Sequence, residues 1–270
     1  MKSRIQEAKD LPGGLVLPGL DTDAPYSSKL SARSALYTDL QLLLDDRPEP
    51  LTAEEYRRLV LDANCLSRGS SAARQKIWSE LRKRYPLDRR DPLFNAYWEE
   101  WRRSQSDQER ALTTYVAFAL NDRLVTDIGT EWLCPYLRRA PAEIRVPDLR
   151  AFLERSGREN HPELLEWTEG TKHKVAKHFL ASVRDFGLAQ GRGAKKTIRP
   201  ALYGSPVRLL IRVLRLAGAG DLAIIGTPIF RLLSIEGNEI IEALGELNRQ
   251  GQLRFRMQAD VVELKIGGAE

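Results

Sequence analysis

The sequence has few of the residues that metal sites and disulfide frameworks require. Among 270 residues there are only two cysteines and three histidines. Cys65 and Cys134 lie far apart in apolar surroundings without a CxxC motif, which predicts no disulfide and suits a reducing compartment. His173 and His178 are five residues apart and fall on different faces of a helix. This spacing does not match a known metal-binding motif, so we expect no bound metal.

Nucleotide-binding motifs and long apolar runs are also missing. The chain contains neither a phosphate-binding GxxxxGKS/T loop nor a GxGxxG after a predicted strand, so we expect no cofactor. The longest apolar run, near residues 209–216, is interrupted by Arg212 and Arg215, whereas a membrane span needs about 20 apolar residues. The first ten residues lack the apolar segment of a signal peptide. No residue has the setting of a nucleophile. We therefore expect a cytoplasmic protein that is not an enzyme.

The composition is that of a folded protein with a mildly basic surface. Apolar residues make up 42% of the chain, which is enough for a sizeable core. The net charge of +5 favours polyanionic partners, although only weakly. The distribution of charge along the chain is therefore more informative than its total.

Helical patterns dominate the first half of the chain, and their start signals are specific. Thr52-Ala-Glu-Glu is a capping box, and Asp91-Pro92 is a helix start with proline at the first position. Together with apolar periodicity, such signals predict helices over residues 34–45, 52–64, 70–85, 92–101, 106–121 and 122–137. We predict an extended arm over 1–30, a helical bundle over 31–140, a connecting segment over 141–170 and a second domain over 171–270.

The second domain has the element order of a winged helix-turn-helix. It is expected to begin with a helix over 171–187, a flexible loop over 190–198 and a short strand over 198–202. The winged unit follows, with helices over 206–217, 227–234 and 238–250 and alternating strands over 253–257 and 261–266. Thr227 is predicted to cap the middle helix, with Pro228 at its first position. The predicted fold is mainly α, with a small N-terminal helical bundle and a C-terminal winged-helix-like domain carrying a β-hairpin wing.

Positive charge is concentrated just before the winged unit. Asp185 is the only acidic residue between Lys172 and Arg215. Several lysines and arginines in one short region favour contacts with the phosphates of a nucleic acid, with a strong salt dependence of binding, over a role in solubility alone. The candidate contacts in this region are Lys172, Lys174, Lys177, Arg192, Lys195, Lys196 and Arg199.

A smaller basic region lies at the start of the helix over 70–85. In Ser67-Arg-Gly-Ser-Ser, backbone N–H groups and hydroxyls can hold a phosphate, with Arg68 completing the grip. Arg74 follows on the helix itself. The alternative is an ordinary solvated helix face, and the sequence favours the two interpretations about equally.

The helix that would enter the major groove is unexpectedly acidic. Its only residue near the start suited to base contacts is Asn238. Four carboxylates lie on or just before this helix: Glu236, Glu239, Glu242 and Glu246. They would repel DNA phosphates, which disfavours a sequence-specific reader in the usual docking. An alternative function is therefore a protein-interaction scaffold, in which the acidic helix and the wing bind a partner.

With these elements in order, the chain resembles the BrxA family of bacterial BREX phage-defence systems over residues 30–266. The resemblance rests on Asn64-Cys-Leu-Ser-Arg-Gly-Ser-Ser-Ala-Ala-Arg74, on the helix over 171–188 and on the segment 240–266. It implies a small, mostly helical protein in two parts, without enzymatic activity. It further implies that the protein binds double-stranded DNA and acts beside the methyltransferase and ATPase subunits of its system.

Overall fold

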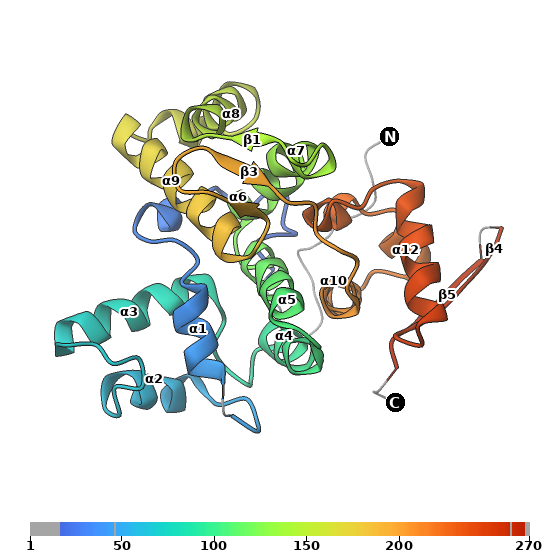
Figure 1. Ribbon diagram of the computed structural model, residues 1–270, viewed down its shortest axis with the longest axis horizontal. Helices are drawn as coiled ribbons and strands as arrows, with labels where there is room; N and C mark the ends of the chain where they lie inside the picture. Colours follow the sequence, from blue (N-terminus) through green and yellow to red (C-terminus); the bar gives the residue numbers. More distant parts are fainter. Residues whose placement is uncertain (1–16, 46, 260, 268–270) are drawn as a thin grey trace.

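The computed structural model describes residues 17–45, 47–259 and 261–267 and is mainly helical (Figure 1). The helices before residue 204 are α1 (Tyr37–Leu44), α2 (Ala53–Leu61), α3 (Ser71–Arg84), α4 (Pro92–Arg103), α5 (Asp107–Leu120), α6 (Arg123–Asp127), α7 (Cys134–Arg138), α8 (Val146–Glu159) and α9 (Glu169–Asp185). Short 3-10 or π segments are η2 (Ser28–Ser31), η3 (Ile128–Leu133) and η4 (Pro162–Leu165). No helix of the described ranges is long and apolar enough to cross a membrane.

The predicted helix starts are confirmed by their capping hydrogen bonds. Thr52 Oγ1 accepts the Glu55 N–H at 3.3 Å, and the Glu55 carboxylate accepts the Thr52 N–H at 2.7 Å. Asp91 Oδ1 accepts the Leu93 N–H at 2.8 Å, with Pro92 at the first helical position. These contacts join neighbours in the sequence, which is why the sequence alone predicts them.

The segment predicted as one or two helices over 122–137 has a less regular backbone. It consists of α6, the π-helical η3 and α7. Gly129 lies in η3, where an added Cβ would come within 2.5 Å of the Tyr115 hydroxyl and 2.6 Å of Leu232 Cδ2. Close packing against α5 and the later segment η5 (Pro228–Leu233) therefore leaves no room for a Cβ here unless these side chains shift.

The predicted flexible loop over 190–198 is instead a β-hairpin. Strands β2 (Ala189–Gln190) and β3 (Lys195–Thr197) pair in an antiparallel fashion, and β1 (Glu143–Ile144) pairs with the other edge of β3. The short strand predicted over 198–202 was wrong in position, because the strand ends at Thr197. Gly191, with φ of +106°, permits the turn, and the pairing partner β1 lies about fifty residues earlier.

The C-terminal elements follow the predicted order with one addition. They are α10 (Gly204–Leu216), α11 (Asp221–Ile225), η5 (Pro228–Leu233), α12 (Asn238–Arg249), β4 (Arg254–Gln258) and β5 (Val261–Lys265). Strands β4 and β5 form an antiparallel hairpin. The predicted middle helix is a 3-10 segment, and the Thr227 side chain makes no capping hydrogen bond. The short helix α11 was not predicted.

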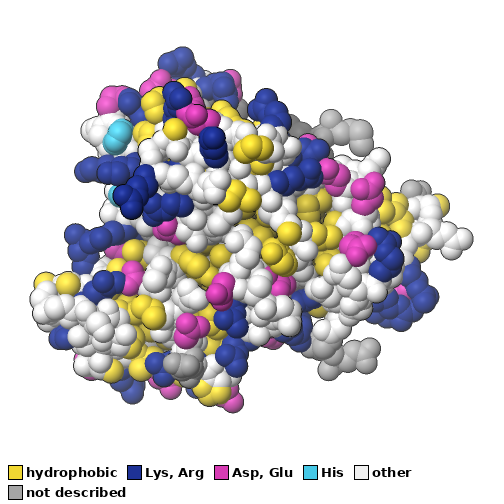
Figure 2. All heavy atoms as spheres, viewed as in Figure 1, with side chains coloured by type: hydrophobic (Ala, Val, Ile, Leu, Met, Phe, Trp, Pro, Cys, Tyr) yellow, Lys and Arg dark blue, Asp and Glu magenta, His cyan; other side chains and the backbone are white. Residues whose placement is uncertain are grey.

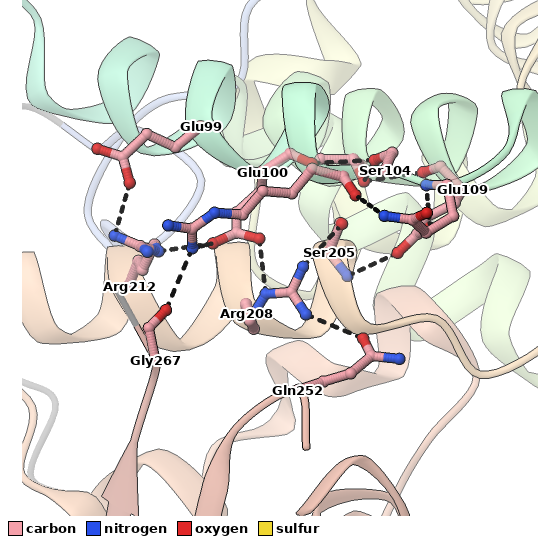
Figure 3. Close-up of polar contacts among 12 residues, drawn as sticks. Glu99, Glu100, Ser104, Glu109, Ser205, Arg208, Arg212, Gln252 and Gly267 are labelled. Carbon is pink, nitrogen blue, oxygen red and sulfur yellow. Dashed lines mark hydrogen bonds and ion pairs between the residues drawn. The ribbon is translucent and has the colours of Figure 1, made fainter. Parts of the chain in front are cut away.

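A buried polar cluster fastens α10 to α4 (Figure 3). Glu100 is fully buried, and its carboxylate accepts hydrogen bonds at 2.7 Å from the Nε atoms of both Arg208 and Arg212. Arg208 also donates to Ser205 and Gln252, so all of its donor nitrogens have partners. α10 lies between the α4–α5 pair and α12 (Figure 1), so this cluster holds the C-terminal elements on the helical bundle.

The first described residues pack against the rest of the protein. Leu17, Tyr26 and Leu30 are buried, and the Tyr26 hydroxyl donates to Asp127 at 2.7 Å. Residues 1–16 of the predicted arm lie outside the described ranges. The proposed domain limits remain predictions.

Candidate nucleic-acid interface

Helix α9 divides into a buried and a cationic face. Its N-cap Thr168 accepts the Thr171 N–H at 3.1 Å, so the helix begins two residues before the predicted start. Val175 and Phe179 are fully buried, whereas Lys174 and Lys177 are exposed. Within the described ranges neither lysine forms an ion pair. Their spacing of three residues places both ammonium groups on one outward stripe of the helix.

Lys172, on the first turn of the same helix, has a different environment. It is only 6% exposed, and its Nζ donates to the Glu169 carboxylate at 3.2 Å. Glu169 also forms an ion pair with Arg150 of α8. Lys172 therefore fixes the start of α9 against α8, and it is not placed as a phosphate contact.

The segment around η2 adds two cations that the sequence did not predict. Lys29 in η2 and Arg33, two residues after it, are exposed, and η2 packs along α9. His178 of α9 contacts the Leu30 carbonyl through Nδ1 at 2.8 Å, and Arg84 of α3 donates to the Ser34 and Arg33 carbonyls, both at 2.6 Å. These contacts hold η2 between α9 and the end of α3. Because these partners are far apart in the sequence, local composition carries no signal for this position.

Side chains alternate between the two faces of the β2–β3 hairpin, so some of its cations are buried and others are exposed. Lys195 is 7% exposed, and its Nζ donates to the Arg192 carbonyl at 3.1 Å across the turn. Burial, with a further contribution from Arg184, lowers the pKa of Lys195. Lys196 points the other way and is exposed, as is Arg192 at the turn. Lys195 therefore stabilises the hairpin, while Arg192 and Lys196 remain available to a ligand.

The available cations of α9, η2 and the hairpin define what we call the α9 surface: Lys29, Arg33, Lys174, Lys177, Arg192 and Lys196. Figure 2 shows Lys and Arg side chains gathered on the side of the molecule that α9 and η2 occupy. After burial, the charges of Lys177 and Arg33 help to lower the pKa of His178, so both lie near that imidazole. Such an array attracts polyanions.

Acidification tests whether His178 holds η2 as described. Burial lowers the pKa of His178, so the unfolded chain binds a proton more readily than the folded chain. Stability should be retained above the unfolded pKa of about 6.5 and fall as pH decreases below it. We expect a smaller loss of Tm between pH 7.5 and 5.5 in His178→Asn than in wild type. His173→Asn, at an exposed position of α9, is the control, and an identical pH dependence in all three proteins would contradict this role.

Arg68 and Arg74 do not join the α9 surface. Arg68 forms an ion pair with Asp39 of α1, and its backbone N–H donates to Asn64 Oδ1 at 2.8 Å. The donors of the predicted phosphate-binding site at Arg68 are therefore already bound to groups of the protein. Arg74 is half-buried, and it precedes Arg84 by ten residues, which places it about 15 Å farther along α3.

Arg199, the last candidate, is engaged by the acidic helix α12. Its Nη2 donates to Glu239 Oε1 at 3.1 Å, and Arg138 of α7 forms an ion pair with the same carboxylate. Glu236 forms ion pairs with Arg138 at 3.1 Å and with Arg231 at 3.2 Å. Two of the four carboxylates expected to repel DNA are thus neutralised within the protein. Glu246 is paired with Arg249, and Glu242 is exposed.

The comparisons with known proteins identify the family. A search of curated proteins found no match to this chain. The sequence model of the BrxA family matches residues 24–213, which include η2, α9, the β2–β3 hairpin and most of α10. The match ends before α11, so it covers less of the C-terminal elements than the resemblance inferred from the sequence. Because this match spans most of the described protein, the chain belongs to the BrxA family and is a component of a BREX phage-defence system.

Proposed function

We propose that this protein binds double-stranded DNA through phosphate contacts and is a non-enzymatic component of its defence system. The observation that carries the proposal is the α9 surface. Lys174, Lys177, Arg192 and Lys196 are exposed and form no ion pair within the described part of the chain. Arg138 and Arg199, in contrast, are paired with Glu236 and Glu239. Cations without internal partners are the ones that can replace counterions on a phosphate backbone.

The C-terminal elements support DNA binding in an indirect way. The order of α10, α11 with η5, α12 and the β4–β5 hairpin agrees with the element order predicted for a winged helix-turn-helix unit. In this proposal α12 does not enter the major groove, since Glu242 and Glu246 would face phosphates. The unit instead stabilises the protein through α10, and the α9 surface binds the duplex with little sequence preference.

A salt titration tests this function directly. We expect a random-sequence duplex of about 30 base pairs to bind at low salt, with log K decreasing linearly as log[salt] increases. Four to six phosphate contacts predict a slope of about −4 to −5. Duplexes of different sequence should bind with similar affinity. No binding at 50 mM salt would refute the proposal, and a large preference for one sequence would refute contact through phosphates alone.

A protein-interaction scaffold is the second candidate, and one observation favours it. A groove of about 460 Å³ lies between α11, η5 and α12. Leu222 and Ile241 at this groove are 53% and 37% exposed, so they present apolar surface together at one place. A scaffold role predicts that Glu242→Lys with Glu246→Lys abolishes binding to the purified methyltransferase or ATPase of the system, with DNA binding intact. Equal binding by wild type and variant would rule out this surface.

A further inference from the structure

Three arginines from different parts of the chain converge on the start of α12. Arg138 comes from the end of α7, Arg199 follows β3, and Arg231 lies in η5. They surround Glu236 and Glu239 in a continuous chain of ion pairs, Arg199–Glu239–Arg138–Glu236–Arg231. The cluster carries three positive and two negative charges, so its cations are only partly neutralised by the protein.

The Arg138 guanidinium already binds two oxyanions. It directs Nε toward Glu236, at 3.1 Å, and Nη1 toward Glu239, so donors on two different sides of the planar group each engage a carboxylate. Arginine donors bind phosphate oxygens as they bind carboxylate oxygens, so a phosphodiester can replace Glu239 as a partner. The Arg138 guanidinium also holds the pKa of Glu239 below its usual range, so this carboxylate is charged at neutral pH.

The side chains of the cluster are accessible to solvent, and their ion pairs are weak enough for another anion to replace a carboxylate. The five side chains are between 30% and 50% exposed. Ion pairs at this exposure contribute little to stability, so a competing anion can displace them. The groove of about 460 Å³ opens beside the cluster, and Arg231, Glu236, Gly237 and Asn238 line it. A phosphate can therefore reach Arg231 from the solvent side.

We propose that Arg138, Arg199 and Arg231 form a second phosphate-binding site, which Glu239 occupies and masks until a nucleic-acid backbone displaces it. This inference rests on the proposed DNA binding. In it, Glu239 lowers the affinity for DNA because it competes with phosphate for the three arginines. A duplex already bound at the α9 surface would supply the phosphate at high local concentration. Release of Glu239 would add contacts beyond those of the α9 surface and extend the DNA footprint toward α12.

The test compares two carboxylates of the same helix. Glu239→Gln keeps an oxygen that can accept the Glu236 N–H, at 3.2 Å in the native protein, but it removes the charge that holds Arg138 and Arg199. Glu242→Gln removes an equal charge from an exposed side chain with no ion pair in the described chain. We expect Glu239→Gln to bind a 30-base-pair duplex about tenfold more tightly at 0.1 M salt, with a salt slope steeper by about one to two. Glu242→Gln should change the affinity less than twofold.

Adding Arg138→Ala and Arg199→Ala to Glu239→Gln should abolish the gain and restore the wild-type slope. Glu236→Gln, which frees Arg231, is a second variant in case Glu239→Gln lowers the Tm, and it should also tighten binding. Equal affinities of Glu239→Gln and Glu242→Gln, with wild type still binding, would overturn the masked site but leave the proposed function intact. Failure of all proteins to bind at 50 mM salt would overturn both.

Discussion

Replacing Glu100 with glutamine is expected to destabilise the folded protein by about 3–5 kcal/mol, the usual cost of removing one partner from a buried ion pair. The Glu100 carboxylate is fully buried and bonds the Nε atoms of Arg208 and Arg212, each at 2.7 Å. A neutral amide leaves the Arg208 guanidinium without a counter-charge and leaves Arg212 with only the half-exposed Glu99. Arg208 is 7% exposed, so water cannot replace the lost partner without opening the packing of α10 on α4.

Urea denaturation measures this effect, and the neighbouring Glu99 provides a matched control. Glu99 forms an ion pair with the same Arg212, at 3.0 Å, but its side chain is 47% exposed. Glu99→Gln should therefore cost about 1 kcal/mol or less. If both variants lose the same stability, the buried cluster does not hold α10 as described. Replacing Glu100, Arg208 and Arg212 together with apolar residues of similar size should recover much of the loss.

Reversing the charge of the α9 surface should produce the largest change in DNA affinity. We expect the fourfold variant Lys174→Glu, Lys177→Glu, Arg192→Glu and Lys196→Glu to bind duplex DNA about 10²–10³-fold more weakly at 0.1 M salt. Each lost phosphate contact removes about one unit from the salt slope, and each new carboxylate adds repulsion. Stability should change little, because these side chains are exposed and carry no ion pair in the described chain.

The control variant reverses four other exposed arginines, so that the net charge changes equally. Arg57 and Arg58 of α2, Arg89 before α4 and Arg102 on α4 are exposed and lie outside the α9 surface. The affinity of this control should fall much less, through the general loss of positive charge. Fluorescence anisotropy across 50–300 mM salt would measure both variants. Equal weakening would show that the total charge governs binding and that the α9 surface has no special role.

The helices of this protein are predictable from the sequence because their signals are local. The capping box of Thr52 and Glu55 spans three residues, and the apolar positions of α9 repeat at the helical period. The hairpin over 189–197 was mistaken for a loop because its strands are too short for an alternating pattern. Its edge partner Glu143 lies more than fifty residues from Lys196.

The candidate site was predictable only as a region. The stretch from Lys172 to Arg215, in which Asp185 is the only acid, contains Lys174, Lys177, Arg192 and Lys196, and all four are exposed. Lys172 and Lys195 belong to the same run of charge, yet both are buried. A count of charges cannot separate these two groups, since the orientation of each side chain depends on what packs against its helix or strand.

The amino-acid sequence by itself determined the helical character, the helix starts, the family and the region in which positive charge is concentrated. Tertiary structure decided which charges remain available. Arg68 is paired with Asp39 and Arg199 with Glu239, across 29 and 40 residues of sequence, while Lys29 and Arg33 reach the α9 surface only through the docking of η2. Helix signals act between neighbours, whereas the availability of a cation depends on carboxylates and carbonyls that packing brings from distant parts of the chain.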